Sequence, residues 1–232
     1  MQLTILSGGA AQALVQALAE RFRAETGYAI AGSFGAVGGM REKLLAGAAA
    51  DLLILTAPMI RELAEQGYLD AATIRDIGCV RTALAVPSGA PLPAIANAEG
   101  LRAALLGADA IHFPDPERAT AGIHFARVLA EVGISGALLA AKARTHANGA
   151  AAMRALAGAG ARAIGGTQAT EILATPGVRL VGPLPAPFDL ATVYTLALGN
   201  AARAPGPARV LADLLTAPEQ SDLRARLGFE AL

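Results

Sequence analysis

The chain has no tryptophan, only six phenylalanines and three tyrosines, and no excess of either charge, with 19 basic and 19 acidic side chains among 232 residues. Aromatic side chains on which nucleic-acid bases can stack are therefore scarce. No stripe of lysine and arginine runs along the sequence, as binding to a polyanion would require. These absences exclude nucleic acid as an expected partner.

Cysteine and long apolar segments are also scarce. Cys79 is the only cysteine, so no internal disulfide can form, and its place at the start of an apolar run predicts a buried, inert thiol. The three histidines, His112, His124 and His146, are scattered and lack metal-ligand spacing. No apolar run is long enough for a membrane helix. We expect a monomer with no metal, no cofactor and no membrane insertion.

The first residues, MQLTILSGG, contain neither a charged segment followed by a long apolar one nor a small-residue cleavage site. The sequence as printed thus shows no export signal. Two interpretations stay open: a cytoplasmic protein, or an exported protein whose signal has been removed.

Short apolar runs alternate with segments of helical periodicity along most of the chain, which predicts an α/β fold with a largely parallel sheet. The first strand is expected over Leu3–Leu6, followed by a turn at 7–9 and a helix over Ala10–Thr26. In such folds, ligands bind at the carboxyl ends of the strands. Further strands are expected at 28–34, 51–55, 82–86, 110–113, 162–165, 178–181 and 191–198, and further helices at 39–47, 58–66, 101–106, 121–132, 147–157, 205–215 and 218–227.

Two points where the chain can cross between lobes divide the sequence, one near Arg81 and one in the proline-rich stretch near Phe188. Residues 1–81 and 189–232 then form a discontinuous first lobe, and residues 82–188 form an inserted second lobe. Helix starts rich in glycine and hydroxyl groups would face one cleft. This is the arrangement of a hinge-bending binding protein.

Residues 32–56, GSFGAVGGMREKLLAGAAADLLILT, have the backbone pattern of an anion site. An extended segment ends at Phe34, a glycine-rich turn follows, and a helix begins. Peptide N–H groups at a helix start favour an anion. Ala36, Val37 and Gly38 supply such groups but no hydroxyl, so the pattern indicates binding by backbone donors.

Polar residues at other expected turns offer further donors. Ser7, beside Gly8, either contacts a ligand or caps the following helix, and Thr120, a credible N-cap, faces the same alternative. Asn148 stands at a helix start that we expect to point toward ligand. Thr167 follows a strand and either donates to ligand or merely begins a helix.

Two side chains are the candidates for catalysis. His146 is either an acid or base near neutral pH or a loop histidine exposed to water. Arg118 either clamps a carboxylate or lies solvated on its loop.

The order of four segments resembles the molybdate-binding, type II periplasmic solute-binding proteins of ABC transporters. These segments are SGGAAQAL, GSFGAVGGMREKLLAGAAADLLI, FPDPERATAGIHFARVL and RAIGGTQA, and LTAPEQSDLRARLGF looks like that family's closing helix. The resemblance implies a two-lobed α/β fold with a ligand cleft between the lobes. It also implies a small anionic ligand, a periplasmic location and, for an exported protein, an ABC permease as partner.

By position, the family's two ligand-binding serines fall on Gly9 and on Ala36 or Val37, so both hydroxyls are missing. The family's site tyrosine falls on Gly165. A tetrahedral oxyanion needs a dense shell of donors, and each buried oxygen left underpaired costs about 1–3 kcal/mol. The smaller side chains also predict a larger cleft, which suits an organic carboxylate better than molybdate.

The resemblance places backbone contacts to the ligand near Ala121 and Asn148. It also leaves an alternative open, because some relatives of these binders isomerise small tricarboxylates such as aconitate. A chain without an export signal fits a cytoplasmic catalyst, and proton transfer needs a base within hydrogen-bond reach of the substrate carbon. His146, Arg118 and Ser7 are the only candidates that the sequence offers.

Overall fold

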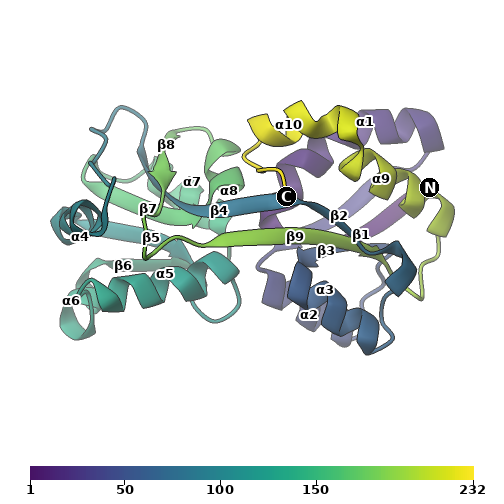
Figure 1. The fold of residues 1–232 in the computed structure, drawn as a ribbon, viewed down its shortest axis with the longest axis horizontal. Coiled ribbons are helices and arrows are strands. Elements are labelled where there is room, and N and C mark those ends of the chain that lie inside the picture. Colours follow the sequence, from purple (N-terminus) through teal and green to yellow (C-terminus); the bar gives the residue numbers. More distant parts are fainter. The chain divides into compact units, whose positions relative to one another are not determined.

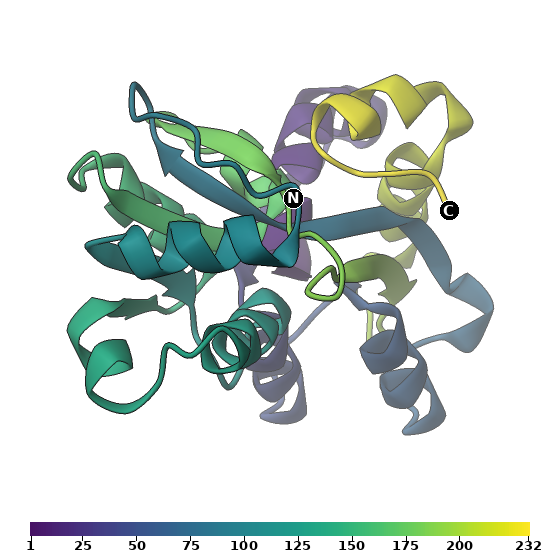
Figure 2. The same ribbon diagram turned by 60° about the vertical axis from the view of Figure 1, so that its left-hand side comes forward.

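The structure is a computed structural model that describes all residues, 1–232. The chain forms two compact units: Met1–Val80 with Thr192–Leu232, called unit 1, and Arg81–Ala191, called unit 2. Each unit is a sheet with helices on both faces (Figure 1 and, turned, Figure 2). The predicted α/β class is therefore confirmed. None of the helices combines the length and the apolar character that a membrane span needs.

The sheet of unit 1 has the strand order β2-β1-β3-β9. β1 (Gln2–Gly8) pairs in parallel with β2 (Ala29–Gly35) and with β3 (Leu52–Thr56), and β9 (Ala191–Leu198) runs antiparallel to β3. Every residue of β3 is buried, as expected of a strand that is covered on both faces. The carboxyl ends of β1, β2 and β3 therefore share one edge.

Helices cover the two faces of this sheet. α1 (Gln12–Thr26) and α9 (Pro205–Thr216) pack against each other on one face, and α2 (Val37–Leu45) and α3 (Ala57–Glu65) lie on the other (Figure 1). α1 ends at Gly27, whose φ of 74° is the left-handed conformation that glycine adopts readily. The shorter helical segments of unit 1 are η1 (Gly9–Ala11), η2 (Ala71–Thr73), η3 (Pro218–Gln220) and α10 (Ser221–Arg226).

The sheet of unit 2 has the strand order β8-β4-β7-β5-β6. β4 (Arg75–Pro87) enters from unit 1 and pairs antiparallel with β7 (Ala163–Gln168) and β8 (Val178–Pro183). β5 (Ala110–Pro114) pairs in parallel with β7 and with β6 (Ala143–His146). The carboxyl ends of β5, β6 and β7 thus also share one edge.

Unit 2 has one apolar core on each face of its sheet. The larger core is built from α4 (Ala98–Gly107) and α5 (Thr120–Glu131), with α6 (Gly136–Lys142) packed at its margin. The smaller core lies under α7 (Gly149–Ala157) and α8 (Ala169–Leu173). Alanines dominate the smaller core, so α7 approaches the sheet closely.

Several elements differ from those that the sequence predicted. α6, β6 and α8 were not expected, because each is short and none has a clear apolar pattern of its own. β4 begins at Arg75, well before the expected start at residue 82. β7 extends through Gln168, so Thr167 lies within the strand and not after it.

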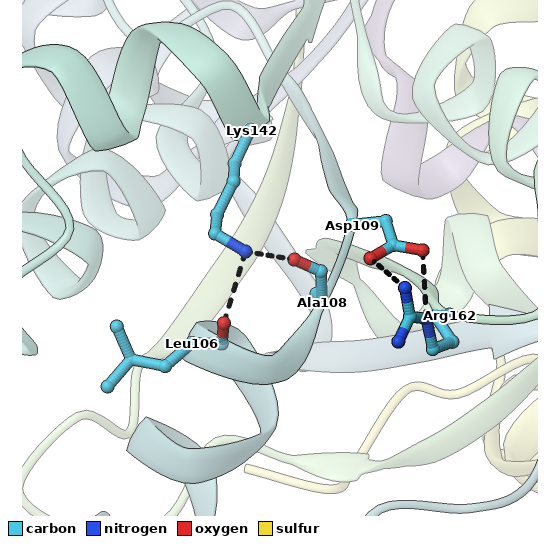
Figure 3. A network of polar contacts seen from close by, with 5 residues as sticks. All are labelled: Leu106, Ala108, Asp109, Lys142 and Arg162. Carbon is cyan, nitrogen blue, oxygen red and sulfur yellow. Dashed lines mark hydrogen bonds and ion pairs between the residues drawn. The ribbon is translucent and has the colours of Figure 1, made fainter.

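Polar contacts tie together the amino-end edge of the unit 2 sheet (Figure 3). Arg162, before β7, forms two hydrogen bonds with the carboxylate of Asp109, before β5, at 2.9 and 2.7 Å. Lys142 donates to the carbonyls of Leu106 and Ala108 at the end of α4. Because Asp109 and Arg162 are both well exposed, their ion pair contributes at most about 1 kcal/mol.

Candidate functional site

Two helix starts lie side by side at the carboxyl-end edge of the unit 1 sheet. The register places Gly8, the last residue of β1, opposite Gly35, the last residue of β2. η1 begins at Gly9 and α2 at Val37, and neither start has a side-chain cap. The residues that the sequence predicted for an anion cradle are brought together here, namely Gly8, Gly9, Ala36, Val37 and Gly38.

Ser7 does not cap the following helix, so that alternative is wrong. Its hydroxyl is fully buried and donates to the carbonyl of Gly8 at 2.9 Å. A side chain at Gly8 would collide with Val37, at 2.8 Å, and with the ring of Tyr194, at 3.1 Å. Tyr194 comes from β9, far along the chain, and sequence reasoning missed its place at this edge.

Three helix starts gather at the carboxyl-end edge of the unit 2 sheet. Pro114 of β5 is in register with His146 of β6, and β7 lies on the other side of β5. α5 follows β5, α7 follows β6 and α8 follows β7. The topology therefore brings the predicted residues Thr120, Ala121, Asn148 and Thr167 to one edge.

The loop before α5 is organised by Asp115. Its carboxylate accepts hydrogen bonds from the N–H groups of Glu117, at 2.7 Å, and Arg118, at 3.2 Å. The Arg118 side chain is 54% exposed and lies 3.9 Å from the same carboxylate. The prediction that Thr120 is the N-cap is wrong, since Ala119 is the N-cap and Thr120 is the first helical residue. No side chain caps α5.

The start of α7 is closed by its own N-cap. The Asn148 side-chain oxygen accepts from the N–H of Ala151 at 2.9 Å, and the Asn148 carbonyl accepts from the N–H of Ala152 at 3.0 Å. Asn148 thus has the expected place at a helix start. Its oxygen stabilises the helix and is not available to a ligand.

A buried carboxyl, Glu171, lies against the same helix start. It accepts a hydrogen bond from the Thr167 hydroxyl at 2.6 Å and further hydrogen bonds from the N–H groups of Gln168, Ala150 and Gly149. Burial raises the pKa of Glu171, and these donors oppose that shift. The Thr167 hydroxyl is therefore used within the protein. Sequence reasoning missed Glu171, although its spacing of four residues from Thr167 in a strand-to-helix turn was visible.

The expectation of extra room at Gly165 is wrong. A side chain at this position would lie 2.6 Å from both Met153 and Leu156 of α7. The space left by the missing tyrosine is filled by the smaller core of unit 2. Gly165 therefore serves packing between α7 and β7.

His146 is not an exposed loop residue, because it ends β6 and is half-buried. Its Nε2 lies 3.1 Å from Nδ1 of His112 on β5. The ring planes differ by 12° and the ring centroids are 5.3 Å apart. Since the nitrogens are much closer than the centroids, the rings meet edge to edge and share one N–H···N hydrogen bond.

This pair stays neutral near neutral pH. Burial lowers the pKa of both imidazoles, and the neighbouring His146 and Arg144 lower the pKa of His112 further. A hydrogen bond between two imidazole nitrogens also holds only one proton, so protonation of both facing nitrogens would break it. His146 can therefore accept a proton as a neutral base.

The histidine pair should make stability fall in acid. Both pKa values lie below the ordinary 6.5, so the folded state binds fewer protons than the unfolded one below that pH. The pair's contribution is present above pH 6.5 and is lost as pH falls through the lowered pKa values.

Melting temperatures between about pH 8 and about pH 5 test this, with the double variant His112→Asn/His146→Gln as reference. We expect the wild type to lose stability relative to the variant as the pH falls, because the variant lacks the titrating groups. Melting temperatures that fall equally with pH in the two proteins would contradict the claim that the histidine pair destabilises the fold in acid. Contributions from Glu171 cancel in the difference.

A cavity of about 190 Å³ opens elsewhere in unit 2. It is lined mainly by apolar side chains, among them Val86, Leu92 and Ile164, with Arg162 as its charged member. Arg162 precedes β7, so the cavity lies toward the amino-end edge of the sheet and away from the helix starts. Its lining is therefore unsuited to an anion, and the candidate site remains at the carboxyl-end edge. No group of three or more metal-ligating side chains occurs in the structure.

Comparison with known proteins places this chain among solute binders. Residues 3–230 match the sequence profile of the family described as "Bacterial extracellular solute-binding protein". An aconitate isomerase from Pseudomonas sp. is 26% identical over 222 residues, which cover 94% of this chain and 83% of that protein.

Solved structures share the fold. The periplasmic molybdate-binding protein of Azotobacter vinelandii superposes with a TM-score of 0.79 at 18% identity, covering 99% of both chains. The sulfate-binding protein SubI of Mycobacterium tuberculosis gives a TM-score of 0.76 at 19% identity, covering 100% of this chain and 87% of that one. The predicted resemblance to type II periplasmic binding proteins is thus confirmed at the level of family and fold.

Proposed function

Because this chain belongs to the family of bacterial extracellular solute-binding proteins, we propose that it binds a small organic carboxylate in preference to a compact oxyanion such as molybdate. The observation that carries this proposal concerns two buried hydroxyl groups at the candidate edges, those of Ser7 and Thr167. Ser7 donates to Gly8, and Thr167 donates to Glu171. Both hydroxyls are thus used within the protein.

The remaining donors suit carboxylates. They are the backbone N–H groups at the uncapped starts of η1, α2 and α5, the hydroxyl of Thr120, and the guanidinium of Arg118, which is 54% exposed and lies 3.9 Å from the Asp115 carboxylate. Helix starts and arginine both bind carboxylates well. One carboxylate group of an organic acid presents two oxygens, whereas a tetrahedral oxyanion gathers four around one atom, so a single helix start can satisfy one such carboxylate group.

A thermal-shift screen tests this function. Citrate, tricarballylate, cis- and trans-aconitate and succinate are compared with molybdate, sulfate and phosphate. A ligand at about 100 times its Kd stabilises the fold by about 2.7 kcal/mol, which is several degrees for a protein of this size. A panel in which only inorganic oxyanions raise the melting temperature would refute the proposal.

We further propose an ABC permease as partner of an exported form, which an adjacent permease gene would support.

Isomerisation of a small tricarboxylate is the second candidate function. Two observations favour it: the aconitate isomerase relative and the neutral imidazole of His146 at the end of β6, where substrate would lie. Moving a double bond along a tricarboxylate requires a base that removes a proton from one carbon and returns it at another. His146 would take that proton, while its hydrogen bond to His112 fixes the ring.

Proton NMR of the protein with cis- or trans-aconitate separates the two functions. An isomerase converts one spectrum into the other, and His146→Gln abolishes the conversion. His124→Gln is the matched control, because Nε2 of His124 pairs with the carbonyl of Phe188 and His124 lies on α5, not at the end of β6. Unchanged spectra with a bound ligand would leave binding as the function.

A further inference from the structure

The first three N–H groups of α7 are satisfied by side chains. Gly149 and Ala150 donate to the carboxyl of Glu171, and Ala151 donates to the Asn148 side chain. The regular helical pattern begins at Ala152, which donates to the Asn148 carbonyl. A helix start normally leaves such N–H groups for side chains, water or ligands. At α7 the N–H groups of Gly149, Ala150 and Ala151 are all occupied within the protein.

Residue 149 and Glu171 fit each other closely. A β-carbon on Gly149 would lie 1.9 Å from a carboxyl oxygen of Glu171 and 2.2 Å from the Thr167 hydroxyl. Only glycine therefore lets the carboxyl reach the helix start. With 7% of its surface exposed, Glu171 lies beneath α7 as a fixed part of the edge and not as a mobile surface group.

The start of α5 is built differently. No side chain caps it, and Gly122 allows the carbonyls of Pro114 and Asp115 to lie against its first turn, where a β-carbon would meet them at 2.5 and 2.2 Å. The loop that carries Arg118 is thus held directly at this helix start. Two neighbouring helices of one sheet edge therefore differ in whether an acidic side chain occupies their N–H groups.

We propose that Glu171 is a specificity-determining residue: its carboxyl occupies the start of α7 and denies those donors to a ligand, so that α5 receives the anion in unit 2. This inference rests on the proposed function. A tetrahedral oxyanion needs donors around all of its oxygens and is disfavoured by the loss of one helix start. One carboxylate group of an organic acid needs donors to two oxygens, and the start of α5 supplies them.

The test is calorimetric titration of Glu171→Ala with sodium molybdate, sodium sulfate and tricarballylate. Removing the carboxyl frees the N–H groups of Gly149 and Ala150. We expect a gain in oxyanion affinity of at least about tenfold, the effect of one recovered hydrogen bond to an anion, with tricarballylate affinity unchanged within about threefold. Glu131→Ala, an exposed position on α5, is the matched control and should change neither affinity.

Glu171→Gln covers the case in which the alanine variant fails to fold. The amide keeps one acceptor oxygen and the shape of the side chain, so it should release one donor and give a smaller gain of the same sign. A folded variant that gains no oxyanion affinity would overturn the inference. A wild type that binds no carboxylate, with oxyanion binding gained on mutation, would refute the proposed ligand class and uphold the role of Glu171.

Discussion

Gly149→Ala is expected to reduce the free energy of unfolding by about 3 kcal/mol or more. The added β-carbon would lie 1.9 Å from Glu171 and 2.2 Å from the Thr167 hydroxyl. Neither group can stay in place, so the buried carboxyl loses donors as it moves. Urea denaturation measures the loss.

Two further variants separate this clash from a general effect of alanine. Gly107→Ala in α4 is the matched control, because its β-carbon meets no atom within 4 Å, and it should be neutral or slightly stabilising. Glu171→Ala/Gly149→Ala should recover most of the stability that Gly149→Ala loses in the wild-type background, since the new methyl fills the vacated space. Additive losses in the double variant would contradict the packing described here.

Thr120→Pro is expected to weaken ligand binding by about 10- to 100-fold, because it removes one backbone N–H that would donate to the anion. The stability of the fold should change little. Proline is well tolerated at the first position of a helix. The preceding residue, Ala119, has φ of −101° and ψ of 127°, the extended conformation that proline requires before it. The fold should therefore persist without the N–H.

Thr120→Ala provides the control for this substitution. It removes the hydroxyl and keeps the backbone N–H, so the difference between the two variants isolates the backbone donor. Calorimetric titration with the best carboxylate from the thermal-shift screen gives the affinities. Equal affinities for the proline variant and the wild type would mean that α5 does not receive the anion.

Local sequence patterns predicted most elements of the fold. Leu14, Leu18 and Phe22 follow helical spacing and are buried in α1, and the continuous apolar run before Thr56 forms the fully buried β3. Short elements escaped prediction. β6, with the sequence ARTH, has no apolar face of its own and becomes a strand because β5 supplies the hydrogen-bonding partner.

The candidate site was predicted less completely than the fold. Glycine, capping residues and periodicity, which are local signals, predicted helix starts within two residues of those observed at Gly9, Val37, Thr120 and Gly149. What those starts can bind depends on contacts across the chain. Tyr194 reaches Gly8 from β9, and the partner of His146 is His112 on the neighbouring strand.

Glu171 shows why the residue types expected at a site do not suffice to predict its ligand. The absence of serine and tyrosine suggested a roomier site, yet Met153 and Leu156 fill the space at Gly165, and a glutamate occupies the donors at α7. The proposed preference for a carboxylate therefore rests on which donors remain unoccupied. The volume of the site does not distinguish a carboxylate from a compact oxyanion.

Calorimetric titration of the wild-type protein with tricarballylate or citrate, and separately with sodium molybdate, tests the central claim most directly. The account predicts a saturable one-site isotherm with an organic carboxylate and none with molybdate at the same concentrations. Tight molybdate binding without any carboxylate binding would contradict it.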